Sequence, residues 1–236
     1  MRLKSSLIAL SLSLICLAPR VALADIDTLQ LTGVVPGNVT NGVYVYPYIF
    51  TVDVGGISTP GVDLSCLSYN REIEVNETWD VNVTNLGSLT GPIDGSSVLQ
   101  LEEDAYLDSL YGTGFDGATN SEIQFAIWYI LDPSAFPTTS STGYDTVSQT
   151  LVADAALAVP KESTQYLDQF TLYTPVTPQG SQNWDNLGEP QEFLEYIPAG
   201  VPLSPVTVTP EPSSLILMGT GLLGVGLLMR RKLQVA

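Results

Sequence analysis

Histidine is absent from all 236 residues of the chain. Its absence excludes a Cys-His hydrolase and any histidine-assisted transfer of an acyl group to a hydroxyl. Basic residues are also scarce, because residues 25–209 contain only Arg71 and Lys161. The same part of the chain holds 24 of the 25 acidic residues, so its formal charge is −22. Such a surface repels phosphate backbones, which excludes nucleic acid as a partner.

Cysteine is nearly absent, and one of the two cysteines lies in a predicted signal peptide. Residues 1–24 have a basic start, an apolar stretch that includes Cys16, and a small-x-small cleavage site that ends at Ala24. The exported chain would then keep only Cys66, which can form no internal disulfide. A single cysteine of this kind is a reactive thiol, a partner for another chain, or a small buried hydrophobe.

The C-terminal part of the sequence has the pattern of a membrane-sorting signal. Residues 200–212 contain four prolines, which is typical of an extended, semi-rigid linker. Residues 213–229 carry no charge, and their length is near the lower limit of about 17 residues for a transmembrane helix. The basic residues at the start of the tail 230–236 predict that this end lies in the cytoplasm. We therefore expect residues 25–209 to lie outside the cytoplasm.

This C-terminal segment resembles the PEP-CTERM sorting signal of Gram-negative bacteria that secrete exopolysaccharide. The resemblance is carried by Pro210-Glu211-Pro212, the short apolar helix, and the basic pair Arg230 and Arg231. It implies recognition by an exosortase at the inner membrane, followed by removal of the tail. The expected location is an inner-membrane-anchored precursor and then the cell surface or the extracellular matrix.

The predicted ectodomain, residues 25–199, is long enough for one domain with a proper core. Its first and last parts contain short β-branched and aromatic stretches separated by Gly, Pro and Asn, among them residues 71–83, and these stretches indicate strands. Its middle part changes to a helical period, with helix stops at Gly112, Pro133 and Pro160. The order predicts a mainly β fold, a β-sandwich or barrel, with an insertion of about three helices. A separate transmembrane helix is expected at residues 213–229.

One carboxamide, Gln124, stands in an otherwise apolar run that extends from Ile123 to Leu131. Ser121-x-x-Gln124 fits a helix capping box, in which the glutamine would bond back to the backbone. Thr119-x-x-Glu122 fits the same template, and it would leave Gln124 free to face the interior. A buried carboxamide without partners costs about 1–3 kcal/mol, so an inward Gln124 needs a compensating role.

A strand cysteine followed by Ile123-Gln124-Phe125-Ala126-Ile127-Trp128 resembles the thioester domain of bacterial surface adhesins. The stretch from Ala105 to Phe115 likewise resembles the helical insert of exported PEP-CTERM proteins that carry such a cysteine and glutamine. The resemblance implies a thioester bond between Cys66 and Gln124. Phe125, Trp128 and Tyr129 are the expected apolar wall that keeps water away from the bond.

The predicted function is therefore that of an adhesin or biofilm-matrix protein rather than an enzyme, with no cofactor and no metal required. The expected acceptor is an amine on a surface protein or in the exopolysaccharide matrix. The alternative is a non-covalent envelope or exopolysaccharide-associated protein with an inert, buried Cys66. A hydrolase that uses paired carboxylates is a third possibility, although no acid pair stands out by its spacing. The acidic loop 115–122 leaves room for a calcium ion.

Overall fold

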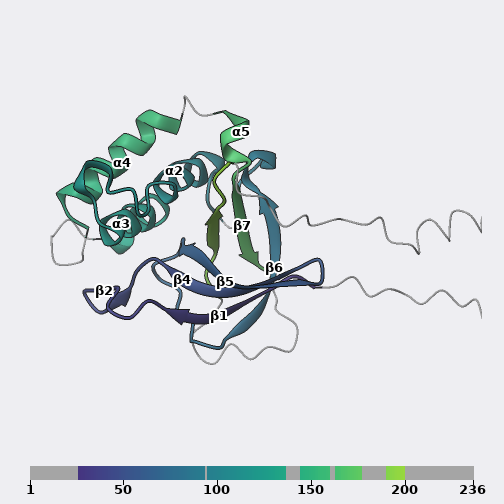
Figure 1. Cartoon of the computed structure of the whole chain (residues 1–236). Helices are drawn as coiled ribbons and strands as arrows, with labels where there is room; N and C mark the ends of the chain where they lie inside the picture. Colours follow the sequence, from purple (N-terminus) through teal and green to yellow (C-terminus); the bar gives the residue numbers. More distant parts are fainter. Residues whose placement is uncertain (1–25, 94, 137–143, 160–162, 177–189, 200–236) are drawn as a thin grey trace, which may run out of the picture. The chain divides into compact units, whose positions relative to one another are not determined.

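The computed structural model describes residues 26–93, 95–136, 144–159, 163–176 and 190–199, all of which belong to one compact unit (Figure 1). The predicted signal peptide, the proline-rich linker and the predicted transmembrane helix lie outside these residues. Within the described residues, no helix is long and apolar enough to cross a membrane.

Six antiparallel strands close into a barrel in the order β1-β4-β5-β8-β7-β6. Alternate residues of β1, β4 and β6 are buried, so each of these strands turns one row of apolar side chains towards the barrel interior. A two-stranded hairpin, β2 with β3, lies between β1 and β4 in the sequence. The strand bounds are β1 Thr28–Val34, β2 Val39–Thr40, β3 Val43–Tyr44, β4 Tyr48–Val54, β5 Ile57–Cys66, β6 Thr78–Asn85, β7 Phe170–Pro175 and β8 Phe193–Tyr196.

The helices are inserted between β6 and β7, and Figure 1 shows α2, α3 and α4 gathered on one side of the barrel. Complete capping boxes begin α2 and α3, at Ser97 with Gln100 and at Thr119 with Glu122. Asp145 caps α4 by accepting hydrogen bonds from two backbone N–H groups. The bounds are η1 Leu86–Ser88, α2 Val98–Asp108, η2 Phe115–Gly117, α3 Asn120–Leu131, η3 Pro133–Ala135, α4 Thr146–Ala158 and α5 Thr164–Leu167.

Two apolar clusters form the core, and α3 contributes to both. The first lies within the barrel and includes Phe50 and Trp79 together with Phe125 from the helix. The second joins the helices to the outer faces of β7 and β8, and it includes Leu172 and Ile127. Helix α3 therefore joins the barrel interior to the helical layer, which explains why its sequence is apolar on almost every side.

The predicted fold class is confirmed as a mainly β fold with a helical insertion, and the sheet is a barrel rather than a sandwich. The three predicted helices are present, with α5 as a short addition. The expectation that residues 71–77 form a strand is wrong, because β6 begins only at Thr78. Asn76 has a φ of 76°, a left-handed conformation that interrupts an extended chain.

Two carboxyl groups on α2, Asp104 and Asp108, are fully buried one helical turn apart. Neither side-chain oxygen of Asp104 has a hydrogen-bond partner within the described part of the chain. Burial raises the pKa of Asp104 well above its ordinary value, and the neighbouring Glu103 and Asp108 raise it further. Burial also raises the pKa of Asp108 to about 7, against an opposing hydrogen bond from Ser65. Both groups therefore favour the neutral acid in the folded chain.

These raised pKa values predict that stability falls as the pH increases. Each group contributes most to stability below its unfolded pKa, near 3.8, and the contribution is lost as the pH rises through the folded pKa. For Asp108 the loss falls between pH 3.8 and about 7. Asp104→Asn should raise the free energy of unfolding at pH 8 by about 1–3 kcal/mol and have little effect at pH 4.

Denaturant unfolding at the two pH values measures this difference, and the exposed Asp116→Asn serves as the matched control. Equal effects of Asp104→Asn at pH 4 and pH 8 would show that folding does not raise the pKa of Asp104.

Candidate functional site

The pairing of β5 with β8 places the site at the end of the barrel. Cys66, the last residue of β5, pairs with Phe193 at the start of β8. The Leu67 N–H continues the pairing with a 3.0 Å hydrogen bond to the Glu192 carbonyl. Gln191 immediately precedes Glu192 in the sequence, and its side chain lies beside that of Cys66.

The Cys66 sulfur is surrounded by polar groups although the residue is only 1% exposed. The thiol donates to the Gln191 Oε1 atom and also lies 3.3 Å from the Ser68 carbonyl oxygen. The indole Nε1–H of Trp128 donates to the sulfur at 3.3 Å. The hydroxyl of Tyr48, which donates to the Tyr44 carbonyl, lies next to the thiol as a further polar neighbour. A buried thiol that packed only as a small hydrophobe would not need so many polar neighbours.

The electrostatic environment keeps the thiol protonated. Burial raises the pKa of Cys66 to about 12, and Trp128 and Ser68 oppose this rise through their hydrogen bonds. A thiolate at this position is therefore rare at neutral pH. The pKa of the Tyr48 hydroxyl is raised as well, chiefly by burial and then by the charge of a Cys66 thiolate. Cys66 and Tyr48 are thus coupled, and both favour their neutral forms.

The carboxamide of Gln124 contacts Cys66 at the backbone. Gln124 is fully buried, as expected once Thr119 and Glu122 form the cap. Its Nε2 atom donates to the Cys66 carbonyl at 2.6 Å, and its Oε1 atom accepts from the Tyr111 hydroxyl at 3.0 Å. The Tyr111 ring stacks on Tyr46 with a centroid distance of 3.8 Å. Gln124 therefore ties α3 to the end of β5, and both ends of its carboxamide are satisfied.

The three residues of the predicted apolar wall occupy different positions. Trp128 touches the sulfur, and Phe125 packs edge-on against Trp128 with a centroid distance of 5.2 Å. Tyr129 instead stacks on Tyr144, with a centroid distance of 4.1 Å. Tyr69, which the sequence analysis did not single out, packs against Trp128 at 5.2 Å.

Gln191 is the residue at the sulfur that sequence reasoning missed. It stands in Pro190-Gln191-Glu192-Phe193-Leu194, where one carboxamide lies two residues before the apolar pair that begins β8. The same signal drew attention to Gln124, a single carboxamide at the head of an apolar run. Gln191 is 5% exposed. Both glutamines carry this signal in the sequence, but only the β5–β8 register brings Gln191 to the thiol.

Arg71 braces the segment that carries Gln191. Its guanidinium forms a 2.5 Å ion pair with Glu192 and a 3.2 Å hydrogen bond to the Pro190 carbonyl. These two partners flank Gln191 on either side. One of the two basic residues in the predicted ectodomain thus fixes the chain around the carboxamide that faces the thiol.

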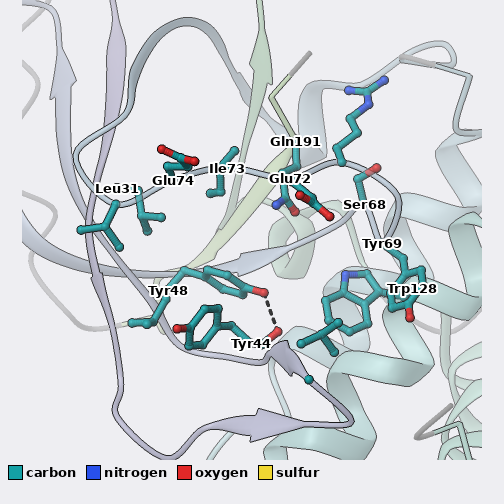
Figure 2. A pocket seen from close by; sticks show the side chains of 15 residues that line it. Leu31, Tyr44, Tyr48, Ser68, Tyr69, Glu72, Ile73, Glu74, Trp128 and Gln191 are labelled. Atoms are coloured by element: carbon teal, nitrogen blue, oxygen red, sulfur yellow. Dashed lines mark hydrogen bonds between the residues drawn. The ribbon is translucent and has the colours of Figure 1, made fainter. Parts of the chain in front are cut away.

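A cleft of about 600 Å³ opens beside the thiol (Figure 2). Tyr48, Ser68, Trp128 and Gln191 line it, and all four also contact the Cys66 sulfur or thiol. Figure 2 shows the side chains of these residues around one hollow, with Tyr48 held by a 2.7 Å hydrogen bond to the Tyr44 carbonyl. In the described residues, no group of three or more His, Cys, Asp or Glu could hold a metal ion, and loop 115–122 therefore offers no such cluster.

Comparison with known proteins identifies the C-terminal segment. Residues 208–232 match the PEP-CTERM protein-sorting motif, which confirms the resemblance stated for Pro210-Glu211-Pro212 and the basic pair. Searches of curated proteins and of solved structures found no match to the chain. The motif indicates an exported protein that is recognised by exosortase and is membrane-anchored in transit in a Gram-negative bacterium.

The contacts of Gln124 predict a stability cost for its removal. Gln124→Ala leaves the Cys66 carbonyl and the Tyr111 hydroxyl without their partner and should lower the free energy of unfolding by about 2–4 kcal/mol. Tyr111→Phe removes only one of the two hydrogen bonds and should cost about 1 kcal/mol. Urea unfolding followed by tryptophan fluorescence measures both.

Gln149 is an exposed glutamine on α4 and gives the matched control. Gln149→Ala should change stability by less than about 0.5 kcal/mol. If Gln124→Ala were as mild as this control, the buried hydrogen bonds of Gln124 would contribute nothing to folding.

Proposed function

We propose that this exported, exosortase-sorted protein captures a partner covalently at the cell surface or in the extracellular matrix, through an internal thioester made by Cys66. The observation that carries the proposal is the contact between the Cys66 thiol and the carboxamide of Gln191, a residue that lines the cleft. The acceptor in this proposal is an amine on a surface protein or in an exopolysaccharide matrix. The protein acts once as an acyl donor and is not a turnover enzyme.

The chemistry of bond formation needs only the two side chains. The sulfur attacks the carboxamide carbon, the carbon–nitrogen bond breaks, and ammonia leaves with the thiol proton. The product replaces a buried primary amide and a buried thiol with one uncharged, less polar group. Water must be kept out while the acyl group waits for its acceptor, and the burial of both residues meets this need.

A partner is captured when its amine opens the thioester and the Cys66 sulfur becomes the leaving group. A neutral amine attacks the acyl carbon, the carbon–sulfur bond breaks, and the amine proton returns to the sulfur to restore the thiol. The Trp128 N–H, which already donates to the sulfur, would stabilise the negative charge that develops there as the bond breaks. Without histidine to activate hydroxyls, amines are favoured as acceptors. A lysine-poor chain would also avoid cross-linking to itself.

Two glutamines compete for the role of acyl source, and the geometry favours Gln191. Its Oε1 atom contacts the sulfur, and the carboxamide carbon is bonded to that oxygen at about 1.23 Å. The hydrogen bonds of Gln124 run to the Cys66 carbonyl and the Tyr111 hydroxyl. Gln191 is therefore proposed as the acyl source, and Gln124 as the residue that orients the end of β5. Peptide mapping of the methylamine adduct distinguishes this assignment from the bond to Gln124 expected from the sequence.

The alternative function is that of a non-covalent envelope or exopolysaccharide-associated protein. The observation that favours it is the raised pKa of Cys66, which makes the thiol a poor nucleophile. On this alternative the sulfur packs in the barrel, and the cleft binds its ligand reversibly.

An intact-mass measurement separates the two functions. If the thioester forms, the purified chain should be lighter than its sequence by one ammonia. Methylamine should then add to one glutamine and free one thiol. Cys66→Ala and Gln191→Ala should each abolish both effects, whereas Gln124→Ala should retain them in the fraction that folds. Peptide mapping after the methylamine reaction identifies the modified glutamine.

The thiol count must be taken after unfolding, because burial alone makes a free Cys66 slow to react in the native chain. An unmodified mass, one free thiol on acid unfolding and no methylamine adduct would together reject covalent capture. A methylamide found on Gln124 would restore that residue as the acyl source.

The sorting motif gives a separate prediction. In a host with exosortase, the mature protein should begin near Asp25 and should lack residues 213–229. Deleting Arg230, Arg231 and Lys232 should leave an unprocessed, mis-sorted precursor, because the basic stop on the cytoplasmic side is lost. Immunoblotting of cell fractions with an N-terminal-domain antibody and a C-terminal tag measures both. A tagged full-length protein at the surface of the unaltered host would contradict the prediction.

A further inference from the structure

The cleft lies next to the buried Cys66 and is lined both by side chains that contact the sulfur and by exposed residues. Its floor is shared with the proposed thioester, since Gln191 and Trp128 belong to both. At its rim, Tyr44 is 51% exposed and Val75 is 48% exposed. A volume of about 600 Å³ is within the usual range for ligand pockets. Any acceptor that reaches the acyl carbon from solvent through this opening passes along these walls.

The walls suit a slim alkyl chain. Apolar side chains come from β1 and from the 68–75 loop, and three tyrosines and a tryptophan add their rings. Figure 2 shows Leu31 and Ile73 on one side of the hollow and Trp128 with Tyr69 on the other. The stem of a lysine side chain buries well against such surfaces, and aromatic faces attract its positive end.

Carboxylates decide the charge of the cleft. Glu72 and Glu74 line it, and Ile73 between them is also part of the wall. The positive charge of Arg71, which lines the cleft too, is offset by its ion pair with Glu192. The cleft therefore has a net negative charge close to the point where an acceptor must attack. The amine that attacks the acyl carbon is neutral at that moment, so the negative charge of the cleft does not attract it. The negative charge attracts instead a separate cationic side chain of the acceptor.

We propose that this cleft is the acceptor site, and that Glu72 and Glu74 select a lysine next to a second basic residue in a partner protein. The proposal rests on the proposed function for the covalent step, but the binding step stands on the cleft alone. A protein segment is the occupant, because the exposed apolar rim formed by Tyr44 and Val75 offers contact area beyond the lysine side chain.

Two matched peptides test the selection with a single reactive amine in each. Acetyl-Gly-Lys-Gly-amide carries one cation, and acetyl-Gly-Lys-Arg-amide adds a guanidinium that is not a nucleophile. The rate of adduct formation with the full-length chain is followed by mass spectrometry. The Lys-Arg peptide should react about two- to fivefold faster at low salt, as expected for exposed ion pairs, and the advantage should shrink as salt is added.

Charge-removing variants locate the effect. Glu72→Gln and Glu74→Gln should each reduce the advantage of the Lys-Arg peptide, and the double variant should abolish it. Glu102→Gln, which removes a carboxylate of α2 outside the cleft, should leave the advantage unchanged. The rate with methylamine should stay within about twofold in all of these variants, because methylamine carries no second charge.

Reversible peptide binding is measured in a chain that cannot form the thioester, so this test does not depend on the covalent step. Calorimetry or NMR titration of the Cys66→Ala chain should show tighter binding of the Lys-Arg peptide, and Glu72→Gln with Glu74→Gln should remove the difference. If methylamine adds but the two peptides react and bind equally, the selection is wrong and the covalent function stands. If no amine adds but the charge-dependent binding is present, the acceptor site stands and the thioester is rejected. Equal binding of both peptides to every variant overturns the inference.

Discussion

The pairing of β5 with β8 is the contact on which the barrel and its site both depend. It joins the strand that ends in Cys66 to the last described strand, and it closes the sheet. Because side chains alternate along a strand, the register decides which residues face the interior. A shift of one residue would turn Cys66 and Phe193 away from the barrel interior. It would also move the Gln191 carboxamide away from the sulfur.

Helix α3 also holds Cys66 in place, through hydrogen bonds to its backbone and to its side chain. Its Gln124 donates to the Cys66 carbonyl just where the β5 ladder ends, so this acceptor is satisfied at a buried position. Four residues later, Trp128 donates to the sulfur. Residues four apart lie on the same face of a helix, so one face of α3 holds both the backbone and the side chain of Cys66. The carboxamide of Gln124 and the indole of Trp128 thus act as one structural unit.

The charged and ionisable side chains have different roles in different parts of the molecule. The predicted ectodomain has 24 acidic residues and two basic ones. Most acidic groups keep the protein soluble and repel other anions. Asp104 and Asp108 are instead buried in α2, where burial raises their pKa values, and Arg71 holds the segment around Gln191. Among the described residues, this buried carboxyl pair therefore lies in the helical layer, and the ion pair of Arg71 with Glu192 lies at the barrel end.

Several features follow from local sequence. The capping pairs Ser97 with Gln100 and Thr119 with Glu122, and the cap Asp145, are encoded within a few residues of each helix start, so the three main helices were predictable. The alternation in β1, β4 and β6 and the C-terminal sorting motif are local in the same sense. The extended character of residues 71–77 was mispredicted, since their composition suits a strand but Asn76 adopts a left-handed conformation.

What only the tertiary structure decided is which groups meet at the thiol. The sequence by itself marked Cys66, Gln124 and Trp128, because a cysteine and a carboxamide stand out in apolar surroundings. It could not rank Gln191, 125 positions after Cys66, against Gln124, 58 positions after it. Strand register is a cooperative property of the whole barrel, since each pairing is fixed by all the side chains that it buries. The closed sheet therefore places Gln191 at the sulfur and Gln124 at the backbone, a choice that no local pattern contains.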